Sequence, residues 1–200
     1  MVEAAKHSKV KLLVVGNVQG EIVKLTQLVK NIQSKKGDFD LLLCAGKFFP
    51  NKVYDMEELR KEALSARGAK MDIETYFTDS SDLAGPLMNS AQGKDGVALM
   101  KRLNFLGRSG IRVVKGLRIA YVSGIDADQL GPEILKADAQ SHYLGNYFVR
   151  QDIERVLQQY HDLVKESSQV GVDILLTGQW PLNISCTVDD PNGDLEAQRM

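Results

Sequence analysis

The apolar positions among the first fifty residues predict a strand, a helix and a second strand. The run from Val10 to Val15 is aliphatic and ends at Gly16, which is typical of a strand buried on both faces of a parallel sheet. Gly37 follows a helical pattern and Gly46 follows a second apolar run, Phe39 to Ala45. The helical pattern is formed by Ile22, Leu25, Leu28, Val29 and Ile32. These elements predict a βαβ unit with parallel strands, so the segments after Gly16 and Gly46 are the first places to look for a site.

The rest of the chain predicts shorter elements and an α/β fold. We expect helices over Met56 to Arg67 and Val97 to Leu103, a third strand over Ile73 to Thr78, and a long loop over Asp79 to Gly96. Short strands, expected to be antiparallel, are predicted at Asn104 to Leu106, Ile111 to Val114 and Leu117 to Ser123. A late amphipathic helix is indicated by Ile153, Val156, Leu157, Tyr160 and Val164, and a last buried strand by Val172 to Thr177.

Length and composition place these elements in one domain. The 200 residues have a formal net charge of −1 and a pI near 6.3, which argues against a surface coated in basic charge. We expect a flexible leader over residues 1–9, the domain over residues 10–182, and a linker-like tail over residues 183–200 that leads to further domains. No apolar run is long enough to span a membrane. The two cysteines, Cys44 and Cys186, are expected to be free thiols in a reducing compartment.

Two glycine-containing loops and four longer stretches resemble a known family. The residues from Gly16 to Gly20 (Gly-Asn-Val-Gln-Gly) resemble the Gly-Asp-x-His-Gly loop of calcineurin-like metallophosphoesterases, and Gly46-Lys47 resembles the Gly-Asp loop of that family. The stretches are similar to the RNA lariat debranching enzyme and to its spliceosomal relatives with a CwfJ-type C-terminal region. They are residues 39–49, 105–107, 116–124 and 172–181, the last of which ends in Trp180-Pro181.

The resemblance implies a metallophosphoesterase sandwich, that is, mixed sheets flanked by helices, in which the metal-ligand positions are altered. The two-cation site of the family needs carboxylate, imidazole and amide ligands on several loops. Asn17 and Gln19 stand where the family has Asp and His, and Lys47 stands where it has a bridging Asp. The third loop, around Asp79, lacks the family's His, and another His is replaced around Gly178 and Gln179.

These replacements predict a vacated metal site, no catalytic residue and no cofactor. Neutral amides bind divalent cations poorly, and an ammonium group opposes them electrostatically. We expect the Lys47 ammonium to lie in the cleft, hydrogen-bonded to Asn17 or Gln19. The histidines, His7, His142 and His161, match no ligand spacing. Asp79, Asp82, Asp126 and Asp128 could form an improvised cation site, although loop aspartates are usually caps or turn residues.

The segment from Lys101 to Arg118 contains basic residues and no acidic ones. Its six basic residues are Lys101, Arg102, Arg108, Arg112, Lys115 and Arg118. A local surface of this kind could contact RNA phosphates or an acidic protein, and a solvated hairpin would explain it equally well.

The resemblance predicts a non-catalytic domain of a nuclear, spliceosome-associated factor. Its expected partners are the lariat debranching enzyme, other spliceosome proteins and branched or lariat RNA, and we expect no membrane partner. Two alternatives stay open at this point. One is an active metal-dependent phosphodiesterase with a remodelled site, and the other is a scaffold that binds only spliceosome proteins.

Overall fold

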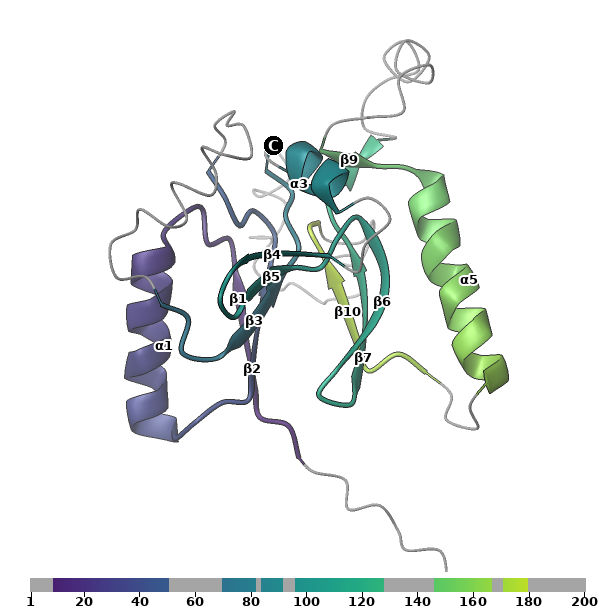
Figure 1. Ribbon diagram of the computed structural model, residues 1–200. Helices are drawn as coiled ribbons and strands as arrows, with labels where there is room; N and C mark the ends of the chain where they lie inside the picture. Colours follow the sequence, from purple (N-terminus) through teal and green to yellow (C-terminus); the bar gives the residue numbers. More distant parts are fainter. Residues whose placement is uncertain are drawn as a thin grey trace, which may run out of the picture.

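The predicted strand–helix–strand unit at the start of the chain is confirmed, except that its first strand is not buried on both faces, since Val14 is 57% exposed. The computed structural model describes residues 9–50, 70–81, 84–91, 96–127, 146–166 and 171–179 (Figure 1). Strand β1 (Leu12–Gly16) and strand β2 (Leu41–Ala45) are parallel, and helix α1 (Ile22–Lys36) connects them. Gly37 ends α1 with a φ of 76°, a left-handed conformation that glycine adopts without steric cost.

Within the described residues, β1 and β2 belong to a five-stranded sheet. The other members are β3 (Glu74–Phe77), β4 (Val97–Met100) and β5 (Leu103–Phe105), and the order is β1-β2-β3-β5-β4. Strands β1, β2, β3 and β5 are parallel, whereas β4 is antiparallel to β5. The loops that follow β1, β2 and β3 therefore leave this sheet at the same end, the carboxyl ends of the parallel strands.

The described residues form two further sheets. The larger has three strands in the order β10-β7-β6, made by β6 (Ser109–Val114), β7 (Leu117–Val122) and β10 (Ile174–Thr177). The antiparallel pairing of β6 with β7 confirms the prediction for that hairpin, while β10 runs parallel to β7. The smaller sheet joins β8 (Ile125–Asp126) to β9 (Tyr147–Phe148).

Side-chain alternation along β2 shows how the layers are stacked. Leu42 and Cys44 belong to the apolar cluster that contains the buried face of α1, whereas Leu41 and Leu43 belong to the cluster that contains residues of β6, β7 and β10. Helix α5 (Arg150–Glu166) contacts β6 and β7, and Figure 1 shows α1 and α5 on opposite sides of the sheets. The layers are thus helix, sheet, sheet, helix, which confirms the α/β class.

Two sequence predictions were wrong, and both concern the segment from Asp79 to Leu103. Helix α3 (Ala84–Ser90) lies where a long loop was expected. Pro86 does not prevent this helix, because it falls in the first turn, where a backbone N–H needs no helical partner. Leu87 and Met88 are buried and attach this helix to the core. The segment expected to be helical after Gly96 is instead the β4–β5 hairpin, with Arg102 at a φ of 64° in its turn. Short apolar runs fit either structure until a pairing strand decides between them.

Other predicted elements are confirmed or cannot be compared. Strands β3 and β10 and helix α5 lie where the sequence places them, although Leu175 in β10 is 61% exposed and this strand is not fully buried. The leader up to residue 8, the helix predicted for Met56 to Arg67 and the tail from residue 183 lie outside the described residues.

Candidate functional site

The loops after β1 and β2 lie side by side, joined by main-chain hydrogen bonds. The N–H of Asn17 donates to the carbonyl of Ala45 at 3.1 Å, and the N–H of Gln19 donates to the carbonyl of Lys47 at 3.0 Å. Asn17 and Gln19 have φ angles of 48° and 52°, in the left-handed region that asparagine tolerates better than most residues. The structure therefore brings together the three residues that stand at the altered ligand positions of the first two loops.

The side chain of Asn17 interacts with the main chain of Lys47. The Oδ1 atom of Asn17 accepts a hydrogen bond from the main-chain N–H of Lys47 at 3.0 Å. Gly46 makes this approach possible, because a Cβ atom there would lie 2.4 Å from Oδ1 of Asn17. The contacts of Lys47 with Asn17 and Gln19 are thus made by its backbone, whereas the sequence had led us to expect them from its ammonium group.

Asp79 is the carboxylate at the centre of this loop cluster. It follows β3 and is fully buried. Its Oδ1 accepts hydrogen bonds from the main-chain N–H groups of Phe48 (2.8 Å) and Ser81 (3.2 Å), and its Oδ2 accepts one from the Ser81 hydroxyl at 2.5 Å. The main chain of Phe49 provides a further hydrogen bond. Asp79 therefore ties the loop after β2 to the loop after β3.

Burial controls the protonation of Asp79. Loss of solvent raises the pKa of this carboxyl from 3.8 to about 6, and the hydrogen bonds from Ser81, Phe48 and Phe49 lower it by less. No cation is among the groups that shift it. Each hydrogen-bond donor around the carboxyl is a neutral group of the protein, so both oxygen atoms have partners without a metal ion.

The same cluster reaches the loops of the second sheet. The N–H of Gly124, after β7, donates to the main-chain carbonyl of Asp79 at 2.8 Å. The hydroxyl of Ser80 lies 3.4 Å from the carbonyl of Gly178, and a Cβ atom at Gly178 would lie 2.9 Å from Cβ of Ser80. The loops after β1, β2, β3, β7 and β10 consequently meet at one end of the sandwich.

Gln179 also lies in this loop cluster. Its Oε1 accepts a hydrogen bond from the N–H of Asp126 at 2.7 Å, and its main-chain carbonyl accepts one from the Thr177 hydroxyl at 2.7 Å. All six residues named as vacated metal-site positions thus lie in the joined loops, and the polar groups described for them bond to other groups of the protein.

These residues do not fit a two-cation phosphoesterase centre. Such a centre needs several anionic or imidazole ligands with free lone pairs. Here Asn17 uses Oδ1 for the Lys47 N–H, Asp79 uses both oxygens within the protein, and Lys47 contributes a positive charge. The described part of the chain contains no group of three His, Cys, Asp or Glu side chains arranged to hold a metal ion. We therefore derive no chemistry from metals at this site.

Two further titratable groups in the described residues, His161 and Cys44, lie outside the loop cluster. His161 is exposed on α5, with its ring 5.8 Å from that of Tyr160. Cys44 is fully buried in β2, and burial raises the pKa of its thiol to about 12, so a reactive thiolate is disfavoured. His7, His142, Asp82, Asp128 and Cys186 lie outside the described residues.

The six basic residues between positions 101 and 118 are spread over two ends of the sandwich. Arg108 precedes β6, whereas Lys115 lies in the turn at the far end of β6, a strand length of roughly 20 Å away. Lys101 and Arg102 form the β4–β5 turn, and the Arg102 guanidinium donates to the carbonyl of Asp72. Arg112 lies over the Tyr76 ring at 5.1 Å, and Arg118 forms an ion pair with Asp173 at 3.2 Å. Whether any of them contacts RNA stays a prediction.

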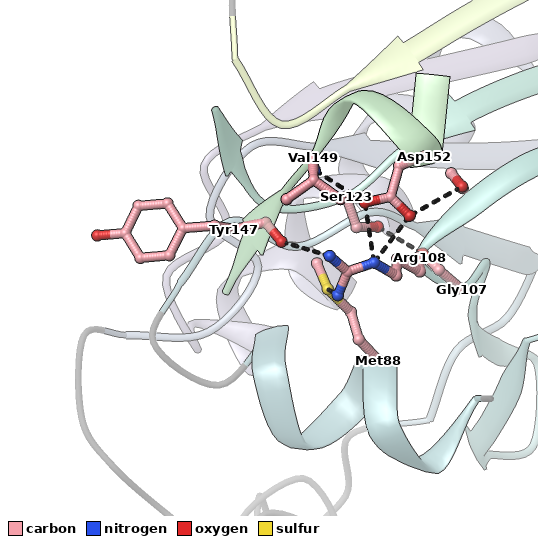
Figure 2. A network of polar contacts seen from close by, with 8 residues as sticks. Met88, Gly107, Arg108, Ser123, Tyr147, Val149 and Asp152 are labelled. Carbon is pink, nitrogen blue, oxygen red and sulfur yellow. Dashed lines mark hydrogen bonds and ion pairs between the residues drawn. The ribbon is translucent and has the colours of Figure 1, made fainter. Parts of the chain in front are cut away.

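The Arg108 side chain is held by polar contacts with other parts of the protein, as Figure 2 shows. Its Nε donates to both carboxylate oxygens of Asp152 at 2.8 and 2.9 Å, and Nη2 donates to the carbonyl of Tyr147 at 2.8 Å. Asp152 is buried in the first turn of α5 and also accepts the N–H of Val149 at 2.9 Å. This ion pair attaches the start of α5 to the start of β6. Arg108 is therefore not a free surface cation.

The sequence reasoning missed three features of the described residues. Ser81 completes the shell around Asp79, and Asp152 pairs with Arg108 across 44 positions of sequence. No local pattern signals either contact. The charge of α1 could have been noticed, since the segment from Ile22 to Lys36 contains four lysines and no acidic residue.

Comparison with known proteins finds relatives that match most of this chain. No protein-family model matches the chain. It is 33% identical to CWF19-like protein 1 of Mus musculus over 86% of its own length and 28% of that protein. It is 31% identical to the CWF19-like protein 1 homolog of Drosophila melanogaster over 87% of its length and 30% of that protein. It is 27% identical to zinc finger CCCH domain-containing protein 64 of Arabidopsis thaliana over 88% of its length and 27% of that protein.

The similarity to proteins named CWF19-like protein 1, or homologs of it, extends over most of the chain. The chain spans less than a third of the length of the curated relatives it matches. None of the helices in the described residues combines the length and apolar character needed to cross a bilayer.

Proposed function

We propose, taking the similarity to CWF19-like protein 1 as the premise, that this chain is a metallophosphoesterase-like domain without hydrolytic activity. The CWF19-like names of its relatives point to a splicing-related factor. The proposed role is to assist intron-lariat debranching in the nucleus, with the lariat debranching enzyme and spliceosome proteins as partners. The ligand that suits this role is branched or lariat RNA.

One observation carries the proposal: the polar groups at the altered ligand positions bond to the protein itself. Asn17 accepts the Lys47 N–H, and Asp79 accepts the N–H of Phe48 and the hydroxyl of Ser81. A metal-dependent phosphoesterase needs those lone pairs for its cations, and its cations to generate the attacking hydroxide. The loops thus meet at one point, and the oxygen atoms that a metal ion would need accept hydrogen bonds within the fold.

An active phosphodiesterase with a remodelled site would need a different nucleophile and a different anion clamp. Among the described residues of the loop cluster we find neither an activated thiol nor a histidine beside a hydroxyl. Ser80 and Ser81 offer hydroxyl groups, but the Ser81 hydroxyl donates to a carboxylate and Ser80 reaches only the Gly178 carbonyl. We favour the non-catalytic role on this ground.

The proposal is tested by mixing the chain with a branched RNA, with and without an active lariat debranching enzyme. The chain alone, supplied with Mn²⁺, should leave the 2′–5′ bond intact, and its addition should increase the rate of the enzyme. Turnover by the chain alone that a chelator abolishes would show an active phosphodiesterase. A protein-only scaffold would bind spliceosome proteins without preferring branched RNA to linear RNA of the same sequence.

A further inference from the structure

Strand β1 has a free edge in the part of the chain that the structure describes. It is the terminal strand of the five-stranded sheet, with β2 on one side. The N–H groups of Asn17 and Gln19 continue the pairing toward the β2 side. Because a parallel ladder uses alternate residues, Leu12, Val14 and Gly16 direct their N–H and C=O groups to the opposite side. Such a row of main-chain groups is a template on which another extended segment can pair.

An apolar groove lies beside this free edge. A cavity of about 210 Å³ is lined by Val15, Gly16, Asn17, Val18 and Glu21 from β1 and the loop after it, and by Lys24, Leu25 and Leu28 from α1. Leu28 is 45% exposed, and Val14, on the other face of the strand, is 57% exposed. A segment paired to β1 would place alternate side chains on the two faces of the sheet and cover both residues. The edge and the groove therefore suit an extended peptide better than a compact ligand.

The surroundings of the groove are positively charged. Helix α1 contains four lysines and no acidic residue, and all four are exposed: Lys24, Lys30, Lys35 and Lys36. Lys24 pairs at 2.9 Å with Glu21, which precedes the helix and lines the groove, and Lys30 lies 3.6 Å from Asp72. Lys24 and Lys35 are spaced to share the side of α1 on which Leu28 lies. Between residues 9 and 50 there are seven lysines and three acidic side chains, although the whole chain has a net charge of −1. The charge favours an acidic occupant.

We propose that the β1 edge and the adjoining groove of α1 bind an extended, acidic peptide segment of a partner protein by strand addition. Main-chain pairing with Leu12, Val14 and Gly16 supplies affinity, apolar side chains of the peptide cover Leu28 and Val14, and its carboxylates face Lys24 and Lys35. RNA offers phosphates for the lysines but no N–H and C=O groups in strand register. The groove borders the loop cluster at Asn17, but the proposal does not depend on the proposed function.

The test uses a fluorescein-labelled peptide of alternating valine and glutamate, long enough to span β1, and the full chain. Binding is followed by fluorescence anisotropy, and hydrogen exchange is followed by NMR. We expect saturable binding, and slower exchange at the amides of Leu12, Val14 and Gly16, whose N–H groups point outward. The amides of Leu13 and Val15 already face β2, so their exchange should change less.

Matched variants separate strand addition from charge attraction. Val14→Pro removes an outward N–H without removing a bond to β2 and should abolish binding, whereas Val14→Ala keeps that N–H and should weaken it modestly. Lys24→Glu should weaken binding about tenfold, while Lys165→Glu on α5 should leave it unchanged. A peptide of alternating valine and lysine should not bind. Absence of binding, binding indifferent to Val14→Pro, or binding for which oligouridine RNA competes equally would overturn the proposal.

Discussion

At the scale of single residues, Asp79 illustrates how a loop position acquires a structural role. The sequence predicts that the loops after β1 and β2 meet at the carboxyl ends of parallel strands, and the family resemblance adds the loop around Asp79. It does not predict that the Asp79 carboxyl turns inward to the N–H of Phe48, because that choice depends on backbone positions 31 residues away. What the sequence suggested as a loop cap is a buried connection between two loops.

The pKa of Asp79 predicts a pH-dependent stability. Because burial raises this pKa from 3.8 to about 6, the folded chain retains a proton that the unfolded chain releases in that interval. The free energy of unfolding should therefore fall by about 3 kcal/mol as the pH rises through the window between 3.8 and 6, and then level off. Asp79→Asn cannot ionise and should lack this dependence. Urea titrations at pH 4 and pH 7 measure both proteins, and an equal difference between them at the two pH values would contradict the assignment.

Asn17 and Lys47 should affect stability in different degrees. Asn17→Ala removes the acceptor of the Lys47 N–H and places a less tolerant residue at a φ of 48°, so the free energy of unfolding should fall by about 1–2 kcal/mol. Lys47→Ala leaves the main-chain bonds in place and should change it by less than about 0.5 kcal/mol. Asn17→Asp keeps an acceptor and serves as the matched control. If Lys47→Ala proved the more damaging change, an ammonium contact within the loops would be indicated.

At the scale of elements, the long periodic helices and the apolar runs of β6, β7 and β10 were predictable, whereas β4, β8 and β9 were not. Helices α1 and α5 carry their apolar pattern within a single segment, so the sequence locates both. Strand β4 and the two-residue strands β8 and β9 depend on partners elsewhere in the chain. The attachment of α5 depends likewise on Arg108, which no sequence pattern joins to Asp152.

The Arg108–Asp152 pair predicts a measurable contribution to the docking of α5. The two side chains are 24% and 9% exposed, so removing the guanidinium leaves a largely buried carboxylate without its cation. Arg108→Gln should lower the free energy of unfolding by about 2–4 kcal/mol. Lys101→Gln, at an exposed turn, should change it by less than about 0.5 kcal/mol. Thermal or urea unfolding measures both, and equal effects would show that the pair contributes nothing particular.

This role also affects how RNA binding should be examined. Charge reversal at Arg108 would disturb the fold before it disturbed any phosphate contact. Exposed turn residues such as Lys101 and Lys115 are better sites for such a test. Any RNA affinity that depends on them should fall steeply with added salt, because phosphate contacts release counterions.

At the scale of the whole molecule, the two sheets bring the loops of distant segments to one end. The family resemblance anticipated this meeting point, and the hydrogen bonds of Asp79 and Gln179 describe how it is held together. These hydrogen bonds make the loop cluster part of what stabilises the domain.

The central claim is that this loop cluster does not hold a pair of catalytic cations, and metal stoichiometry tests it most directly. The purified chain is incubated with Mn²⁺, Fe²⁺ and Zn²⁺ in turn, dialysed, and measured by elemental mass spectrometry. Asn17, Gln19 and Lys47 offer two neutral amides and an ammonium group, so we expect no stoichiometric metal to remain. Retention of two metal ions per chain, lost when Asn17 and Gln19 are replaced by alanine, would contradict the account.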